Sequence, residues 1–224
     1  MPYLPPIVVA ALTGFISGLL LSIPVGPINL TIMNEGARRG FRWACMIGLG
    51  AVVMEVIYCA IAFTGFASIF REGHIKAAME LFSFVFMLFL GVKFLIARSI
   101  PKSNKIEERI EEKLHPHSAF MIGFVRVMGN PGVLVFWVIL AANFVSREWV
   151  QPTGSAKLAC ILGVAAGTAV WFFGLSYAVS LGHRKFSQRT LLRMEHGSGI
   201  GLLILAAFHG AHIIWQMARM TKTM

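Results

Sequence analysis

Two interruptions of otherwise apolar sequence decide how this chain can fold. They read Ile23-Pro24-Val25-Gly26-Pro27-Ile28-Asn29 and Val127-Met128-Gly129-Asn130-Pro131-Gly132. Proline lacks an amide donor and clashes with the preceding helical turn, while glycine adds backbone freedom, so a helix is expected to unwind at both places. Within a bilayer, the carbonyl groups released by a break are tolerated only where they are buried in protein or line a polar cavity. The motifs therefore predict two broken helices that face one polar cavity, and the alternative is a pair of ordinary proline kinks without a ligand.

The sequence around these breaks is apolar over lengths that suit membrane helices. A transmembrane helix needs roughly 20 apolar residues, and six such stretches occur, at residues 7–33, 41–66, 75–96, 118–144, 157–181 and 197–217. We therefore predict an all-α polytopic membrane protein with six transmembrane helices, of which the first and the fourth are broken.

The composition excludes several classes of protein. Of the 224 residues, 57% are hydrophobic and 13% are charged, whereas soluble domains have about 45–50% and about 25%. All ten acidic residues are glutamates, so aspartyl-phosphate chemistry and Ser-His-Asp triads are excluded, and the serines within the spans lack a GxSxG-like setting. The net charge of +10 comes from Lys and Arg in short loops, which favours contact with a lipid bilayer over nucleic acid. We predict no enzymatic activity, no cofactor and no bound nucleic acid.

The loop charges predict the orientation of the chain. The loops after the first, third and fifth spans hold twelve Lys and Arg, and the opposite side holds six. Cytoplasmic loops are enriched in these residues, so both termini are expected outside the cell. Residues 1–98 would form a three-helix repeat, residues 99–117 a cytoplasmic loop with a short interfacial helix, and residues 118–224 a second, inverted three-helix repeat.

Several motifs resemble those of one known family. They are Ile23-Pro24-Val25-Gly26-Pro27, Gly36-Ala37-Arg38-Arg39-Gly40, Gly48-Leu49-Gly50, Glu55, Gly65, Leu90-Gly91-Val92-Lys93, Gly123-Phe124 and Asn130-Pro131. As an ordered set they resemble the lysine exporter (LysE/RhtB) family of amino-acid translocators. The resemblance implies a bacterial inner-membrane secondary exporter of amino acids or similar small solutes, driven by proton antiport.

The chain also departs from the family's pattern. Gly132 stands where the family commonly has lysine, and Arg126 where an apolar or small polar residue is usual. Glu55 stands where aspartate is common, after Met54 in place of glycine. The solute therefore cannot be copied from other members.

The breaks supply the residues that we expect to bind solute. They are Pro24, Gly26, Pro27, Asn29, Arg126, Asn130 and Pro131. Paired interruptions in two halves of a transporter point to its substrate site, and each asparagine adds a hydrogen-bonding amide. The guanidinium of Arg126 can hold a solute carboxylate by two parallel bonds, or it can extend to the headgroups. The sequence leaves both open for Arg126, whereas it favours headgroup contact for Lys93.

Glu55 is the acidic residue that we expect to exchange protons. It lies fourteen positions after Phe41, about 21 Å along a helix, deep in a hydrocarbon core about 30 Å thick. It shares a helix face with Gly48, Ala51, Tyr58, Cys59 and Ala62. Burial favours the protonated form of a carboxyl group, so Glu55 could bind and release a proton as access alternates. The alternative is a structural ion pair with Arg126.

Metal transport is the second function that the sequence leaves open. The wider superfamily that this family resembles includes divalent-cation exporters. His209 and His212 share a face of the last span, but two histidines supply too few ligands for a metal site, and helix contact is the favoured interpretation. We therefore predict no metal site, and the sequence leaves open whether the unit is a monomer or a homodimer.

Overall fold

The computed structural model describes residues 4–24, 26–66, 73–98, 109–110, 113–114, 118–182 and 188–220, and every regular element in these ranges is helical. The helices are α1 (Pro6–Ser22), α2 (Pro27–Arg39), α3 (Phe41–Ile61), the π-helix η1 (Ala62–Phe66), α4 (Gly73–Leu95), α6 (Ala119–Met128), α7 (Pro131–Ser146), α8 (Gly154–Gly182) and α9 (Gln188–Met220). The all-α prediction is confirmed. The predicted interfacial helix lies outside the described residues, except for helical residues 109–110 and 113–114.

Both predicted helix breaks are present, and proline marks the point at which each helix resumes. Pro27 is the first residue of α2 and Pro131 the first residue of α7, where a missing amide donor costs nothing. The helix axis bends by 71° between α1 and α2 and by 66° between α6 and α7. The breaks therefore redirect the chain instead of producing shallow kinks.

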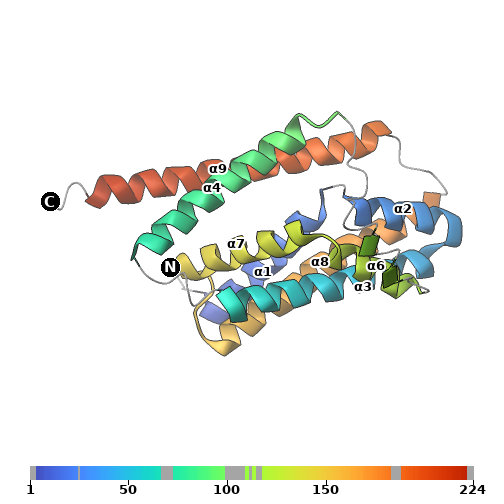
Figure 1. Ribbon diagram of the computed structural model, residues 1–224, viewed down its shortest axis with the longest axis horizontal. Helices are drawn as coiled ribbons and strands as arrows, with labels where there is room; N and C mark the ends of the chain where they lie inside the picture. The colour runs from blue at the N-terminus through green and yellow to red at the C-terminus, as the bar shows by residue number, and fades with distance from the viewer. Residues whose placement is uncertain are drawn as a thin grey trace.

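Long helices run side by side in alternating directions (Figure 1). From the end at which α1 begins, α1, α4 and α8 run one way, and α3, α7 and α9 run the other way. As a result, α1 begins and α9 ends at the same end of the molecule. The most extensive contacts join helices that are distant in sequence: α1 packs against α8, α3 against α6, and α4 against α9.

Glycine allows the closest of these helix contacts. A methyl group added at Gly14 would overlap the backbone of Cys160, and one at Gly163 would overlap the backbone of Ala11. Small residues at such crossings let helix backbones approach in lipid, where van der Waals packing contributes much of the association. The contact between α1 and α8 therefore depends on glycine from both helices.

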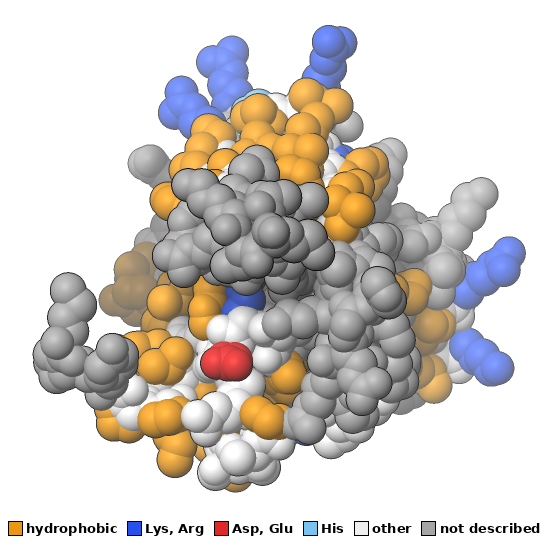
Figure 2. Space-filling view, turned by 90° about the vertical axis from the view of Figure 1, so that its left-hand side faces the viewer, with side chains coloured by type: hydrophobic (Ala, Val, Ile, Leu, Met, Phe, Trp, Pro, Cys, Tyr) orange, Lys and Arg blue, Asp and Glu red, His pale blue; other side chains and the backbone are white. Residues whose placement is uncertain are grey.

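The helix surfaces suit a bilayer. Viewed from the end at which α1 begins, hydrophobic side chains lie around the outline of the molecule (Figure 2). Among the described residues, Phe41–Gly65 and Gly154–Leu181 are each long and apolar enough to cross a membrane, and the two bent pairs raise the number of candidate spans to four. The described residues thus contain two to four candidate spans, whereas the sequence predicts six.

Candidate functional site

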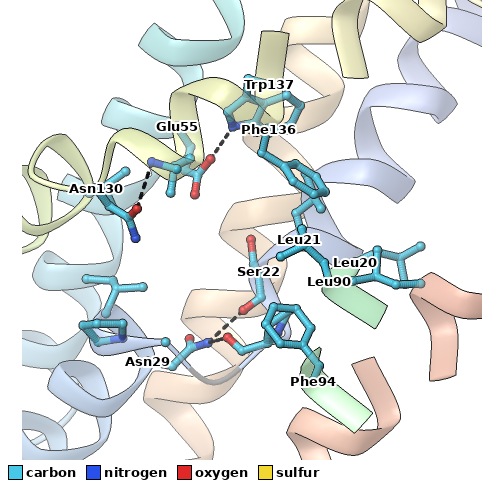
Figure 3. A pocket seen from close by; sticks show the side chains of 18 of the residues that line it. Leu20, Leu21, Ser22, Asn29, Glu55, Leu90, Phe94, Asn130, Phe136 and Trp137 are labelled. Carbon is cyan, nitrogen blue, oxygen red and sulfur yellow. Dashed lines mark hydrogen bonds between the residues drawn. The ribbon is translucent and has the colours of Figure 1, made fainter. Parts of the chain in front are cut away.

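The two helix breaks lie on one cavity of about 330 Å³ (Figure 3). The first break contributes Ser22, Pro24, Gly26, Pro27 and Asn29, and the second contributes Arg126, Asn130 and Gly132. Glu55 of α3 belongs to the same lining and lies beside Asn130 in this view. Pro131 is exposed at the start of α7 and is not part of the cavity lining.

Asn29 holds the first break together. Its side chain is 1% exposed, and Nδ2 donates hydrogen bonds to the carbonyl oxygens of Ser22, at 2.9 Å, and Pro24, at 2.6 Å. Its Oδ1 accepts a bond of 3.1 Å from the indole N–H of Trp171 on α8. The amide therefore replaces the partners that the carbonyl groups lost when the helix ended, and it ties the break to α8.

The side chain of Asn130 is more exposed to the cavity than that of Asn29. Its Oδ1 accepts a hydrogen bond of 3.1 Å from the backbone N–H of Gly132 and so caps α7. Tyr58 of α3 donates a bond of 2.8 Å to the carbonyl oxygen of Met128, which satisfies the last turn of α6. The Asn130 amide nitrogen faces the cavity (Figure 3), and within the described part of the chain no hydrogen bond from it is seen.

Glu55 presents its carboxylate to the cavity from the small-residue face of α3. Every predicted neighbour on that face is buried: Gly48, Ala51, Tyr58, Cys59 and Ala62. The indole N–H of Trp137 on α7 donates a hydrogen bond to Oε2 of Glu55. Glu55 and Arg126 both line the cavity, and the ion pair between them stays an alternative prediction.

Arg126 links the two breaks. Its Nη1 donates a hydrogen bond of 2.6 Å to Oγ1 of Thr31 on α2, and the Thr31 hydroxyl in turn donates a bond of 2.8 Å to the carbonyl oxygen of Pro27. Because Arg126 also lines the cavity, its side chain reaches from α6 to the helix that follows the first break.

Some residues of the site could not be found from the sequence. Trp137 and Phe136 on α7, Leu90 and Phe94 on α4, and Leu202 on α9 line the cavity. Lys93, for which headgroup contact was expected, also contributes to the lining, although its side chain remains exposed. Glu195 of α9 is a second carboxylate with little exposure, at 2%, but it is not in the cavity lining. It lies on α9, which begins at Gln188, before the predicted span.

The side chains of the predicted histidine pair, His209 and His212, lie outside the described residues. Within the described part of the chain, no group of three or more His, Cys, Asp or Glu side chains could hold a metal ion. Cys59 and Cys160 are free and buried, and Cys45 is free and partly buried, as expected of packing residues.

Comparison with known proteins agrees with this architecture. The model of the LysE type translocator family matches residues 19–211. The chain belongs to this family. The relatives include YcgF of Bacillus subtilis, named for amino acid efflux, which is 23% identical over 92% of this chain and 97% of its own length. ChpE of Pseudomonas aeruginosa, named a chemotactic transduction protein, is 23% identical over 87% of this chain and 94% of its own. The arginine exporter ArgO of Shigella flexneri is 27% identical over 73% and 74% of the two chains.

The family model covers both breaks, Glu55, and helices α2, α3, α6 and α7, together with the last residues of α1. No solved structure matches this LysE-type chain. Family membership and the apolar helices together identify an integral membrane protein of a transporter family.

Proposed function

We propose that this protein is a secondary exporter of amino acids or related small solutes in the bacterial inner membrane, and that it works by proton antiport. The observation that carries the proposal is the single cavity on which both helix breaks, a carboxylate and a guanidinium lie. Broken helices around a midplane cavity are the recurring architecture of solute sites in secondary transporters. The names of YcgF and ArgO agree with amino-acid export.

The cavity offers complementary groups for an amino acid. The guanidinium of Arg126 suits the solute carboxylate, the Asn130 amide can donate a further hydrogen bond, and the carboxylate of Glu55 suits the solute ammonium group. A proton and that ammonium group then compete for Glu55. Proton uptake from outside would release the solute, and solute binding from inside would require loss of the proton, which couples the two movements in opposite directions.

We further propose six spans arranged as a 3+3 inverted repeat, with both termini outside. Exchanging the halves maps α1 onto α6, α2 onto α7, α3 onto α8, and α4 onto α9. This exchange converts the α1–α8 contact into the α6–α3 contact and leaves the α4–α9 contact unchanged. These three pairs, α1–α8, α3–α6 and α4–α9, are the most extensive helix contacts of the fold. The ends of helices opposite the start of α1 carry Arg38, Arg39, Arg42, Arg98 and Arg189. That end would face the cytoplasm.

Transport experiments can distinguish the alternative, a metal exporter, from an amino-acid exporter. Divalent cations such as Mg²⁺ and Mn²⁺ prefer oxygen ligands, and among the described lining residues Glu55 is the one carboxylate. Transport of radiolabelled amino acids and of Mn²⁺ by the same vesicles would therefore decide between the two solute classes.

The proposal is tested with the purified full-length protein in proteoliposomes and the substitution Glu55→Gln. Glutamine keeps the size and can accept the Trp137 hydrogen bond but cannot be ionised. We expect normal folding and exchange of labelled for unlabelled amino acid that continues with a weaker affinity, because the amide oxygen of glutamine can still accept a hydrogen bond from the solute ammonium group. Accumulation driven by a pH gradient should be lost. Exchange should also lose its dependence on pH, because protons no longer compete with the solute.

Glu148→Gln is the matched control, because Glu148 is exposed in the turn after α7 and away from the cavity. It should behave as the wild type in both assays. A folded Glu55→Gln protein that still accumulates solute against its gradient in response to pH would refute the role of Glu55.

A further inference from the structure

The cavity has two walls of different chemistry (Figure 3). Asn29, Asn130 and Glu55 lie on one side, where the broken helices meet α3. The opposite side is mainly apolar and is formed by Leu20, Leu21, Leu90, Phe94 and Phe136 from α1, α4 and α7. Lys93 of α4 also belongs to the lining, with an exposed side chain. A solute that fills this space must therefore be polar at one end and apolar at the other.

The charges of the lining are unequal. Arg126 and Lys93 contribute positive charge, and Glu55 contributes the negative charge among the described lining residues. The ammonium group of an amino acid would use this carboxylate, so the described part of the lining holds no second carboxylate for a cationic side chain. Such a side chain would instead lie against the apolar wall, where an uncompensated charge is costly. A carboxylate side chain would lose its hydration against Leu20, Leu21 and Phe136, which α1 and α7 contribute to this wall, whereas Lys93 of α4 has an exposed side chain.

We infer that the solute is an amino acid with an uncharged, apolar side chain of about the size of leucine or phenylalanine, and that this selectivity comes from the apolar wall. The inference rests on the proposed function and narrows its solute class. Complete burial of such a side chain is worth roughly ten- to a hundredfold in affinity. The volume of about 330 Å³ lies near the lower end of the roughly 300–1,000 Å³ of small-molecule pockets, which favours one small solute. The selectivity would differ from that named for ArgO.

Counterflow in proteoliposomes tests the inference. Vesicles that contain the purified full-length protein are loaded with one unlabelled amino acid, and uptake of the same labelled amino acid is measured for leucine, phenylalanine, arginine and glutamate. We expect leucine and phenylalanine to enter at least tenfold faster than arginine and glutamate. Faster or equal uptake of arginine or glutamate would overturn the selectivity and leave amino-acid export in place. Uptake of every amino acid at the rate of protein-free vesicles would overturn the proposed function itself.

A charge placed on the apolar wall tests the mechanism of selection. Leu90 is half-buried on α4, so Leu90→Glu adds a carboxylate facing the polar wall, and Leu90→Gln is the matched uncharged control. The ratio of arginine to leucine uptake should rise at least tenfold in Leu90→Glu and change little in Leu90→Gln. An unchanged ratio in a monodisperse Leu90→Glu protein would overturn the assignment of this wall. If that variant does not fold, the four-solute comparison in the wild type still decides the selectivity.

Discussion

Replacing Asn29 by alanine should destabilise the protein strongly, because this side chain holds the first helix break closed. The substitution removes two donated bonds, to the carbonyl oxygens of Ser22 and Pro24, and one bond accepted from Trp171. Each buried polar group left without a partner costs about 1–3 kcal/mol. Because Pro24 lines the cavity, water can replace part of this loss, and we expect a total cost of about 3 kcal/mol. For a chain of this length that lowers Tm by roughly 6–12 °C.

Thermal unfolding of the purified protein in detergent micelles measures this effect. Asn34→Ala is the matched control, because Asn34 lies on the same helix with an exposed side chain, and its unfolding free energy should stay within about 0.5 kcal/mol of the wild type. Trp171→Phe removes one of the three bonds and should cost about 1 kcal/mol. A Tm for Asn29→Ala that equals that of Asn34→Ala would refute the stabilising role of this amide at the break.

Three further outcomes follow from particular contacts. Gly123→Ala should lower the free energy of unfolding by about 1–3 kcal/mol, because its methyl group would overlap the backbone of Ile47. Gly26→Ala is the control and should be tolerated in the same unfolding assay, since nothing lies within 4 Å of the added carbon. Equal losses of stability in the two variants would contradict the close contact at Gly123. Tyr58→Phe removes the hydrogen bond to Met128 at the second break and should cost about 0.5–1.5 kcal/mol, whereas an unchanged Tm would show that this bond contributes nothing net. The orientation is tested by adding Glu148→Cys or Arg38→Cys to a variant without the native cysteines. An impermeant maleimide applied to intact cells should label the thiol of Glu148→Cys and leave that of Arg38→Cys unlabelled. The opposite pattern would reverse the proposed orientation.

Local stereochemistry allowed the helix breaks to be predicted from the sequence. Pro27 and Pro131 begin α2 and α7, because a proline ring is compatible with the first turn of a helix and incompatible with its interior. The face of α3 around Glu55 was also predictable, since the helical repeat alone places Ala51, Tyr58 and Cys59 beside it, and these residues are buried.

The direction of Arg126 was not predictable, because it depends on which helix lies next to α6. The same side chain could extend to the headgroups or to the breaks. Its hydrogen bond to Thr31 joins two residues that are 95 positions apart in the sequence. Likewise, the burial of Glu195 was not predictable, because it lies before the last apolar stretch on a helix that packs against α4.

The sequence by itself determined that the chain is helical, where two helices break, and which face of α3 carries an acidic group. Only the tertiary structure decided that both breaks lie on one cavity, that Trp137 is the partner of Glu55 across 82 positions, and that α4 supplies an apolar wall opposite them. The physical reason is that helical periodicity and proline sterics act over a few neighbouring residues. The partner of each helix face, by contrast, is selected by close packing between distant segments, in which glycines such as Gly14 and Gly163 set how closely two backbones approach.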